Sequence, residues 1–398
     1  MTSTINTLKS GRILSIDAFR GITFLAMIFV NELGGVTNIT PWLKHMPADA
    51  DAMSFPDIVF PAFLFIVGMS IPFAINGRLA KGDDGLGVQR HILVRAFALI
   101  VMGFFMVNAE EGFNPKLMPI SIQLWSLILY AAVLLVWGVF PFDRGAARRW
   151  LRFVGAALIV LLVFLYRGGD DGRQGMTPQW WGILGLIGWA YLICCELYLL
   201  SRGRMAVLLA MLAGCVGYYA IARQLELPAA LKWLFSQDAH AAHSSIVLCG
   251  IVCALIFFDA GRADSNLRRF VEGTVFAAVL LIAGYLLRPY FRISKIYATP
   301  TWCLYCSAIC IAVFGLLYWL IEMRARERWV RWVEPAAASP LVTYLIPFVI
   351  VALLQLAGLE VPAALRDGWV GLAYAALFAV FVVWLVSLLN KRRIGLRL

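Results

Sequence analysis

Apolar stretches of about 20 residues recur from one end of this chain to the other. Because an α-helix rises about 1.5 Å per residue, each stretch is long enough to cross a hydrocarbon core of roughly 30 Å. Apolar residues make up 62% of the 398 positions, and charged residues make up only 14%. A soluble domain has about a quarter of its residues charged. The pattern therefore predicts an all-α polytopic membrane protein without a sizeable soluble domain.

Twelve of these stretches predict one membrane-spanning helix each, so we expect about 12 helices, in a range of 10–12. They are residues 12–34, 56–77, 90–108, 119–140, 149–166, 180–200, 205–222, 244–260, 268–288, 300–321, 338–357 and 368–390. The first stretch is long, carries charges and lacks a small-residue cleavage site, which is not typical of a cleavable signal peptide. We expect a single transmembrane domain over residues 1–398.

The basic residues are distributed unevenly between the two sides of the membrane. With the N-terminus in the cytoplasm, 23 of the 34 Lys and Arg residues lie on inner segments and 10 lie in outer loops. This bias follows the positive-inside rule, and an even number of spans then places both termini in the cytoplasm. The net charge of +11 therefore indicates orientation, and no nucleic-acid partner is expected.

The first stretch contains polar residues that a simple membrane anchor does not need. On a helix Asp17, Arg20 and Asn31 lie within a stripe about 60° wide, and Asp17 and Asn31 are about 21 Å apart along the axis. Asp17 and Arg20 are three residues apart and can pair. Intramembrane charges usually face the bundle or a water-filled cavity. A charge pair at the headgroup boundary explains Asp17 and Arg20 equally well, but it does not explain Asn31.

A histidine loop follows on the outer side of the membrane. It carries Trp42 and His45, and it lies between Asn31 and Asp57. Asp57 has a complete structural explanation, since Ser54 can cap the second span and the helix dipole favours an anion in the first turn. A neutral imidazole can act as a base or nucleophile near pH 7. A single loop histidine is weak evidence for a catalytic site. The position of His45 between Asn31 and Asp57 strengthens this evidence.

Two groups of residues have the composition of metal ligands. Asp238, His240 and His243 precede the span expected from residue 244, and we expect them in an ordinary loop leading into that helix. Cys303, Cys306 and Cys310 lie roughly on one helical face in apolar surroundings, with no histidine beside them. Such cysteines are more typical of small buried side chains than of ligands. No metal is therefore expected.

Four motifs follow one another within the first 76 residues. The segments "RILSIDAFRGITFLAMIFVNELGG" and "WLKHMPADADAMSFPDIVFPAFLFIVGMSIPFAI" contain S-x-D-x-F-R-G, F-V-N-x-x-G-G, W…K-H and D-I-V-F-P-x-F-x-F-I-x-G. In this order and spacing they resemble the heparan-α-glucosaminide N-acetyltransferase family of membrane acyltransferases. Looser matches are Gln123, "ISKIYATPTW" at 293–302 and "SPLVTYL" at 339–345, whereas 140–240 carries no diagnostic motif. We therefore expect the core of the site in residues 12–77.

The resemblance implies an enzyme that takes an acetyl group from cytosolic acetyl-CoA and delivers it to an amino sugar on the far side of the membrane. It implies catalytic roles for His45, with Asn31 beside it, and we add Asp57. Two mechanisms stay open. His45 either carries the acetyl group covalently, or it acts as general base on the acceptor amine while Asn31 polarises the thioester carbonyl. The second needs no acetyl-imidazole exposed to water, so we favour it.

The resemblance also suggests where the two substrates bind. A tunnel through the helices can hold the pantetheine arm of acetyl-CoA, with its anionic nucleotide end near the inner arginines. The residues expected on the acetyl-CoA side are Asp17, Arg20 and Gln123. The residues expected on the acceptor side are Trp42, Lys295 and Trp302, of which Trp302 is equally typical of an interfacial aromatic belt.

The expected setting is a bacterial inner membrane, with membrane lipid around the chain. The acceptor is then a periplasmic amino sugar or envelope glycan, with N- versus O-acetylation open, and the family gives precedent for a homodimer. A small-solute transporter is the alternative, because charges inside spans suit that class as well. The sequence shows no clear repeat between its halves, and its polar features cluster in the first two spans. A scaffold without catalysis does not explain Asp17, Arg20 and Asn31 together.

Overall fold

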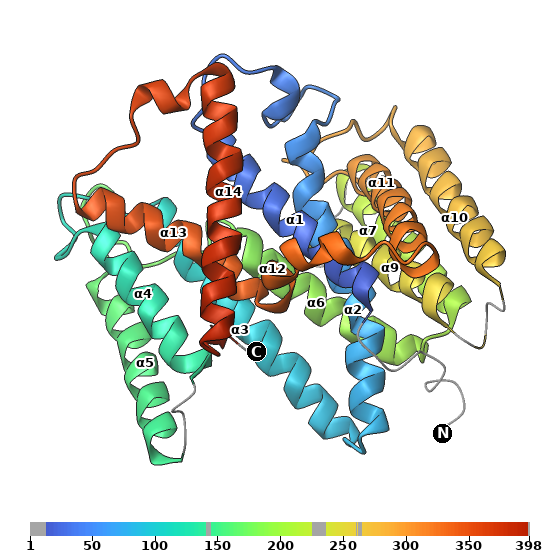
Figure 1. Cartoon of the computed structure of the whole chain (residues 1–398), viewed down its shortest axis with the longest axis horizontal. Helices are drawn as coiled ribbons and strands as arrows, with labels where there is room; N and C mark the ends of the chain where they lie inside the picture. The colour runs from blue at the N-terminus through green and yellow to red at the C-terminus, as the bar shows by residue number, and fades with distance from the viewer. Residues whose placement is uncertain (1–12, 141–144, 225–235, 260, 262–264, 397–398) are drawn as a thin grey trace. The chain divides into compact units, whose positions relative to one another are not determined.

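The computed structural model describes residues 13–140, 145–224, 236–259, 261 and 265–396, and long helices dominate it (Figure 1). The long helices are α1 (Leu14–Leu33), α2 (Phe55–Ala80), α3 (Gly85–Glu110), α4 (Ile122–Trp137), α5 (Ala146–Leu165), α6 (Gly182–Ser201), α7 (Met205–Gln224), α9 (Asp238–Phe258), α10 (Asn266–Leu287), α11 (Pro300–Tyr318), α13 (Pro340–Leu356) and α14 (Gly368–Lys391). The short elements are η1 (Pro41–Leu43), the π-helical turn η3 (Trp319–Met323), η4 (Arg328–Trp332), α12 (Glu334–Ala338), η5 (Ala363–Arg366) and the antiparallel strands β1 (Gly138–Val139) and β2 (Gly395–Leu396).

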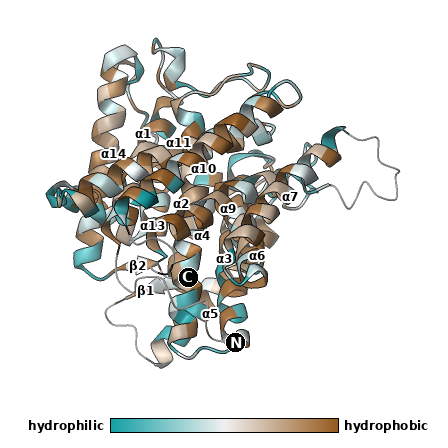
Figure 2. Cartoon of the chain, turned by 90° about the vertical axis from the view of Figure 1, so that its right-hand side faces the viewer, coloured by the Kyte–Doolittle hydropathy of each residue, from teal (hydrophilic) through white to brown (hydrophobic). Residues whose placement is uncertain are grey.

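The helices have the length and composition that a membrane requires. Within the described residues, nine helices are long and apolar enough to span a bilayer, and α4 and α13 are shorter apolar helices. Figure 2 shows hydrophobic residues along most of the length of α2, α9 and α10. The prediction of an all-α polytopic membrane protein is confirmed. The number of spans and the cytoplasmic side of the termini stay predictions, and residues 1–12 and 397–398 lie outside the described part.

Each of the twelve expected stretches coincides with one long helix. Most boundaries differ by a few residues, and the largest difference is at α9, which begins at Asp238 and not at residue 244. His240 and His243 therefore lie in the first two turns of α9, where we had expected a loop. The apolar pattern starts later than the helix because these turns are built from small and polar residues. Residue 12 of the first stretch and residue 260 of the eighth lie outside the described residues.

The first of two compact units comprises Met1–Thr23, Thr40–Ala96 and Leu186–Val330. Helix α9 is its most enclosed element, with every side chain from Ala242 to Phe258 buried. Helix α2 packs along α9, and two glycines allow the backbones to approach closely (Figure 1). A Cβ atom at Gly68 would overlap the Val247 carbonyl, and one at Gly250 would overlap the Phe65 carbonyl. Small residues serve this purpose at many membrane helix interfaces.

The second compact unit comprises Phe24–Ile39, Phe97–Gly185 and Arg331–Leu398. Helix α4 packs against α5 and α13, and the buried indole of Trp125 donates to the Leu162 carbonyl over 3.0 Å. Near the start of α14, the side chains of Thr37 and Asn38 each donate to Asp367 over 2.6 Å. These hydrogen bonds lower the pKa of Asp367 below its usual value. One transmembrane domain over 1–398 stays a prediction.

We expect Gly250→Ala to lower the melting temperature in detergent. The added methyl group would overlap the α2 backbone, and overpacking of this kind costs about 1–3 kcal/mol. Gly214→Ala in α7 is the matched control, because no atom outside the local helix lies within 4 Å of its Cβ position. Its melting temperature should be unchanged or slightly higher, since Ala favours helix over Gly. Equal melting temperatures for both variants would contradict the close α2–α9 packing.

Candidate active site

His45 lies just after η1 and is paired with Asp57 in the first turn of α2. Its Nδ1 atom lies 2.7 Å from Oδ1 of Asp57. The His45 side chain is 47% exposed, whereas the Asp57 side chain is 1% exposed. One partner of the pair is thus accessible to a substrate, and the other is enclosed by the protein. The prediction grouped these two residues in one site, and the structure brings them into direct contact.

The Asp57 carboxylate is held by several hydrogen-bond donors. Its Oδ2 atom accepts from the backbone N–H of Ser54 over 3.0 Å and from that of Met46 over 3.2 Å. The Ser54 hydroxyl lies 2.9 Å from Oδ2 and 2.6 Å from the Lys44 carbonyl, so it ties the histidine loop to the start of α2. A carboxylate that accepts several such bonds is favoured in its ionised form and has a fixed orientation.

The orientation of Asp57 decides which nitrogen of His45 is available. An ionised carboxylate only accepts, so the neutral imidazole carries its proton on Nδ1 and donates it to Asp57. This tautomer is assigned from the hydrogen-bond partner. Nε2 then keeps its in-plane lone pair. A base oriented by a buried carboxylate is the arrangement that hydrolytic triads use for their histidine.

The Asp57 backbone is supported by a buried tryptophan. Pro61 has no N–H, so the carbonyl of Asp57 loses its regular helical donor four residues later. The indole Nε1 of Trp302, from the start of α11, donates to this carbonyl over 3.1 Å. Trp302 is fully buried, which makes it a support of α2 and not an exposed aromatic surface. The sequence had placed Trp302 at the acceptor side or in an interfacial belt.

His243 is a neighbour of this site that the sequence did not indicate. Its ring meets Phe60 edge to face at 5.3 Å and meets Trp302 in the same way at 6.3 Å. The side chain is buried, because α9 begins earlier than expected and carries His243 into the interior of the unit. No local pattern signals this position, since it depends on how α2, α9 and α11 pack.

Lys295 contacts His45 from a segment 250 residues away. Its Nζ atom lies 3.1 Å from Nδ1 and 3.3 Å from Nε2. An ammonium in the plane of the ring at such similar distances would overlap the Cε1 carbon between the two nitrogens. Lys295 therefore lies over the face of the imidazole and does not occupy the Nε2 lone pair. Burial lowers the pKa of Lys295, and the nearby Asp57 carboxylate partly opposes this shift.

The segment that carries Lys295 is fixed to the histidine loop. Asp51 accepts from Arg288 Nε over 3.2 Å and from the backbone N–H of Ile293 over 2.8 Å. Within the segment, the Thr299 hydroxyl accepts from the Ser294 N–H over 3.0 Å. Because both ends of the segment are tied, Lys295 has a defined place beside His45.

The inner charge pair forms as the spacing predicts. Nη1 of Arg20 lies 3.0 Å from Oδ1 of Asp17, and Nη2 donates to the Ser70 hydroxyl over 3.0 Å. The predicted pairing of Asp17 with Arg20 is confirmed. Their role in binding acetyl-CoA stays a prediction.

The remaining predicted site residues lie in different places. Trp42 lies on η1 and is 56% exposed, so it is accessible near His45. Asn31 is exposed in the last turn of α1, and Gln123 is half-buried in α4. Both belong to the second unit, and their predicted places in the site stay predictions.

The metal candidates form no cluster. Among the residues that the structure describes, no group of three or more His, Cys, Asp or Glu side chains is placed to hold a metal ion. Asp238 pairs with Arg223, and the eight cysteines are free thiols within or beside helices.

Comparison with known proteins matches the same part of the chain. Residues 12–118 match the family model described as heparan-alpha-glucosaminide N-acetyltransferase, catalytic. The protein of that name from Homo sapiens is 36% identical over 105 residues, and the one from Mus musculus is 34% identical over 108 residues. Through this segment the chain resembles the heparan-alpha-glucosaminide N-acetyltransferase family. The matches cover 26% and 27% of this chain and 15% and 16% of those relatives.

The family match divides the site into two parts. His45 and Asp57 lie inside the matched segment, as do Asp17, Arg20, Asn31 and Trp42. Lys295 and Trp302 lie far beyond it, although both contact the His45–Asp57 pair. The matched segment thus contains the His45–Asp57 pair, and the structure adds the contacts of Lys295 and Trp302 with that pair.

We expect Trp302→Phe to lower the melting temperature, because it leaves the Asp57 carbonyl buried without its donor. An unsatisfied buried group costs about 1–3 kcal/mol. Adding Pro61→Ala restores a backbone N–H four residues after Asp57 and should recover part of the loss. Trp369→Phe is the control, since that side chain is 86% exposed. A double variant no more stable than Trp302→Phe would argue against the proposed compensation.

Proposed function

We propose that this protein is a transmembrane acetyltransferase. It moves an acetyl group from cytosolic acetyl-CoA to the amino group of a sugar on the periplasmic side of a bacterial inner membrane. The observation that carries the proposal is the contact of 2.7 Å between an exposed imidazole and a buried carboxylate, in a segment that matches the catalytic model of this family. The relatives are N-acetyltransferases by name, which supports acetyl transfer, and the donor, the acceptor and the membrane side are parts of our proposal.

In the proposed mechanism, His45 and Asp57 have one role each. Nε2 of His45 takes a proton from the acceptor nitrogen as that nitrogen attacks the thioester carbonyl. The carbon–sulfur bond breaks, the acetyl group stays on the nitrogen, and the proton passes from His45 to the departing thiolate. Asp57 holds the ring in the correct tautomer and stabilises the imidazolium that forms. The ammonium of Lys295 stabilises negative charge on the carbonyl oxygen as it develops.

The remaining predicted site residues are assigned to substrate binding, to polarising the thioester and to positioning. Asn31 polarises the thioester carbonyl from the outer end of α1, and Trp42 offers an accessible aromatic surface to the sugar. Asp17, Arg20 and Gln123 serve the acetyl-CoA side, where Arg20 supplies the positive charge. Trp302 is assigned to positioning, because its buried indole supports Asp57. A periplasmic amino sugar or envelope glycan is the acceptor, and a homodimer is part of the same proposal by family resemblance.

We expect His45→Ala to reduce acetyl transfer by about 10²-fold or more, since it removes the general base. Asp57→Asn should also reduce transfer, because an amide can donate to Nδ1 and favour the wrong tautomer. The assay measures radiolabelled acetyl transfer from acetyl-CoA to a panel of amino sugars. His91→Ala is the control, since His91 lies near Arg78 and Asp83 at the other end of α2. Full activity in His45→Ala would overturn the site assignment.

The pH profile should report on Lys295. Burial lowers its pKa, so the charged form is lost at a lower pH than for an ordinary lysine. Transfer by the wild type should fall as the pH rises through that lowered pKa. Lys295→Arg stays charged at any accessible pH, and its activity should persist to higher pH. Lys116→Arg, in a loop of the second unit, is the control and should follow the wild type. Identical alkaline limbs for all three proteins would exclude an electrostatic role for Lys295.

A trapping experiment separates the two mechanisms. In the ternary mechanism, incubation with labelled acetyl-CoA and no acceptor leaves no label on the denatured protein. In the covalent mechanism, label stays on the protein and is absent from His45→Ala. We expect no label, because the general-base mechanism forms no acetyl-imidazole. A transporter would instead show solute-dependent stabilisation in a thermal-shift assay and none with acetyl-CoA or CoA.

A further inference from the structure

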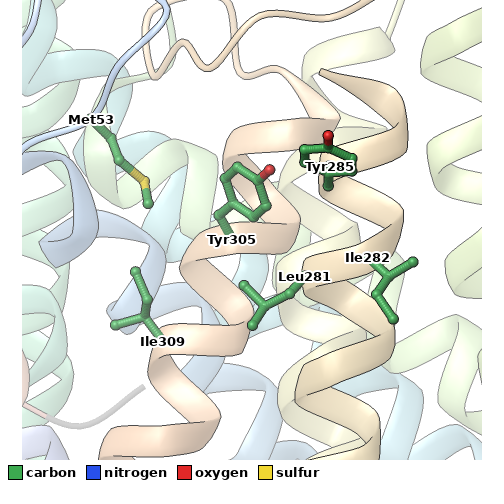
Figure 3. A pocket seen from close by; sticks show the side chains of 6 residues that line it. All are labelled: Met53, Leu281, Ile282, Tyr285, Tyr305 and Ile309. Atoms are coloured by element: carbon green, nitrogen blue, oxygen red, sulfur yellow. The ribbon is translucent and has the colours of Figure 1, made fainter. Parts of the chain in front are cut away.

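An apolar groove lies on the first unit between α10 and α11, close to the histidine loop. Figure 3 shows side chains from three parts of the chain lining it, and its volume is about 510 Å³. The lining residues are Met53, Leu281, Ile282, Tyr285, Tyr305 and Ile309. Volumes of this order are typical of ligand sites.

The groove is open on the side that α10 contributes. Leu281 is 46% exposed, Ile282 is 59% exposed and Tyr285 is 70% exposed. On α10 itself, Gly284 lets the Tyr305 ring of α11 rest against the helix, because a Cβ atom at this position would lie 2.7 Å from that ring. In a membrane helix, exposed apolar side chains face hydrocarbon. The groove is therefore suited to an extended hydrocarbon chain.

The groove lies next to the candidate active site. The sulfur of Met53 lies 3.8 Å from Sγ of Cys306, and that sulfur lies 4.0 Å from the Asp57 carbonyl oxygen. Met53 also directly precedes Ser54, which bonds to the Asp57 carboxylate. A single side chain thus separates the groove from the backbone of the catalytic pair.

The outer end of the groove leads to positive charge. Leu281, Tyr285 and Arg288 are spaced four and three residues apart, so they follow one face of α10 and its end. Arg288 pairs with Asp51, which also holds the Ile293 N–H, and Lys295 follows two residues later beside His45. With the exposed Arg292, this segment carries three positive charges, and the carboxylates that face it are those of Asp51 and Asp57. An anionic group at the end of a hydrocarbon chain would meet these charges before it reached His45.

We propose that the acceptor is a lipid-linked amino sugar. Its hydrocarbon chain lies in the groove between α10 and α11, its anionic linkage lies by Arg288, Arg292 and Lys295, and its amino group reaches Nε2 of His45. This inference rests on the proposed function and names the substrate class. The apolar groove, the positive segment and the exposed imidazole follow one another in the order in which such a molecule carries its parts.

The decisive test fills the groove with a larger side chain. Ile282→Trp lines the groove, and Val279→Trp is the matched control on the same helix, with a similar exposure of 54% and no place in the lining. The assay compares hexadecyl glucosamine 1-phosphate with methyl glucosamine 1-phosphate in lipid nanodiscs. We expect Ile282→Trp to lower kcat/KM for the hexadecyl acceptor at least tenfold and to leave the methyl acceptor within twofold. Val279→Trp should leave both unchanged.

The outcomes separate the inference from the proposed function. Equal effects of Ile282→Trp on both acceptors, or none on the hexadecyl acceptor, would overturn the lipid-linked acceptor and leave acetyl transfer intact. Transfer to neither acceptor by the wild type, or equal transfer by His45→Ala, would overturn the proposed function.

A binding measurement tests the groove without turnover. A hexadecyl acceptor with a photoreactive diazirine at the end of its chain should label peptides that contain Met53 or Ile309. Excess unlabelled hexadecyl acceptor should abolish this labelling, and excess phosphatidylglycerol should not. Labelling that phosphatidylglycerol abolishes equally would identify a bulk-lipid site and overturn the inference, as would labelling confined to other helices.

Discussion

The rest of the site depends on the hydrogen bond between the Asp57 carboxylate and Nδ1 of His45. The carboxylate is buried and the imidazole is half-exposed, so the same contact joins the interior of the unit to the surface where a substrate arrives. Its strength comes from charge, and its direction comes from the donors that hold the other carboxylate oxygen. If Asp57 turned, Nδ1 would lose its acceptor and the tautomer that exposes the Nε2 lone pair would lose its advantage. Every catalytic role proposed for His45 requires that lone pair.

A proline and a tryptophan keep Asp57 in place. Pro61 removes the donor for the Asp57 carbonyl, which would leave an unpaired polar group in a buried first turn. The indole of Trp302 supplies the missing donor from α11, and His243 packs between this indole and the Phe60 ring. The Asp57 carbonyl thus accepts from the Trp302 indole and not from its own helix. This hydrogen bond connects α2 to α11 beside the candidate active site. The position of Asp57 therefore depends on the packing of two helices that are far apart in sequence.

The sequence predicts those features that depend on local spacing. Apolar length gives the helices, the three-residue spacing gives the Asp17–Arg20 pair, and chain proximity places His45 near Asp57. It could not predict contacts that require helix packing, such as Lys295 over the His45 ring or Trp302 on the Asp57 carbonyl. It also misplaced His243, because the start of α9 is polar and lacks the apolar signal of a span. The predicted roles of Asn31 and Gln123 concern the second unit and stay predictions.

The contacts of Lys295 and Trp302 also limit what the family match alone can explain. The matched segment ends at residue 118, yet the His45–Asp57 pair that it contains is contacted by a lysine and a tryptophan near residue 300. A segment that carried His45 and Asp57 without α11 would keep the reactive imidazole and lose the donor that holds α2. It would also lose the positive charge over the ring. The contacts around His45 and Asp57 therefore depend on parts of the first compact unit beyond the matched segment, since the residues after α10 bring the Lys295 ammonium to His45 and the Trp302 indole to Asp57.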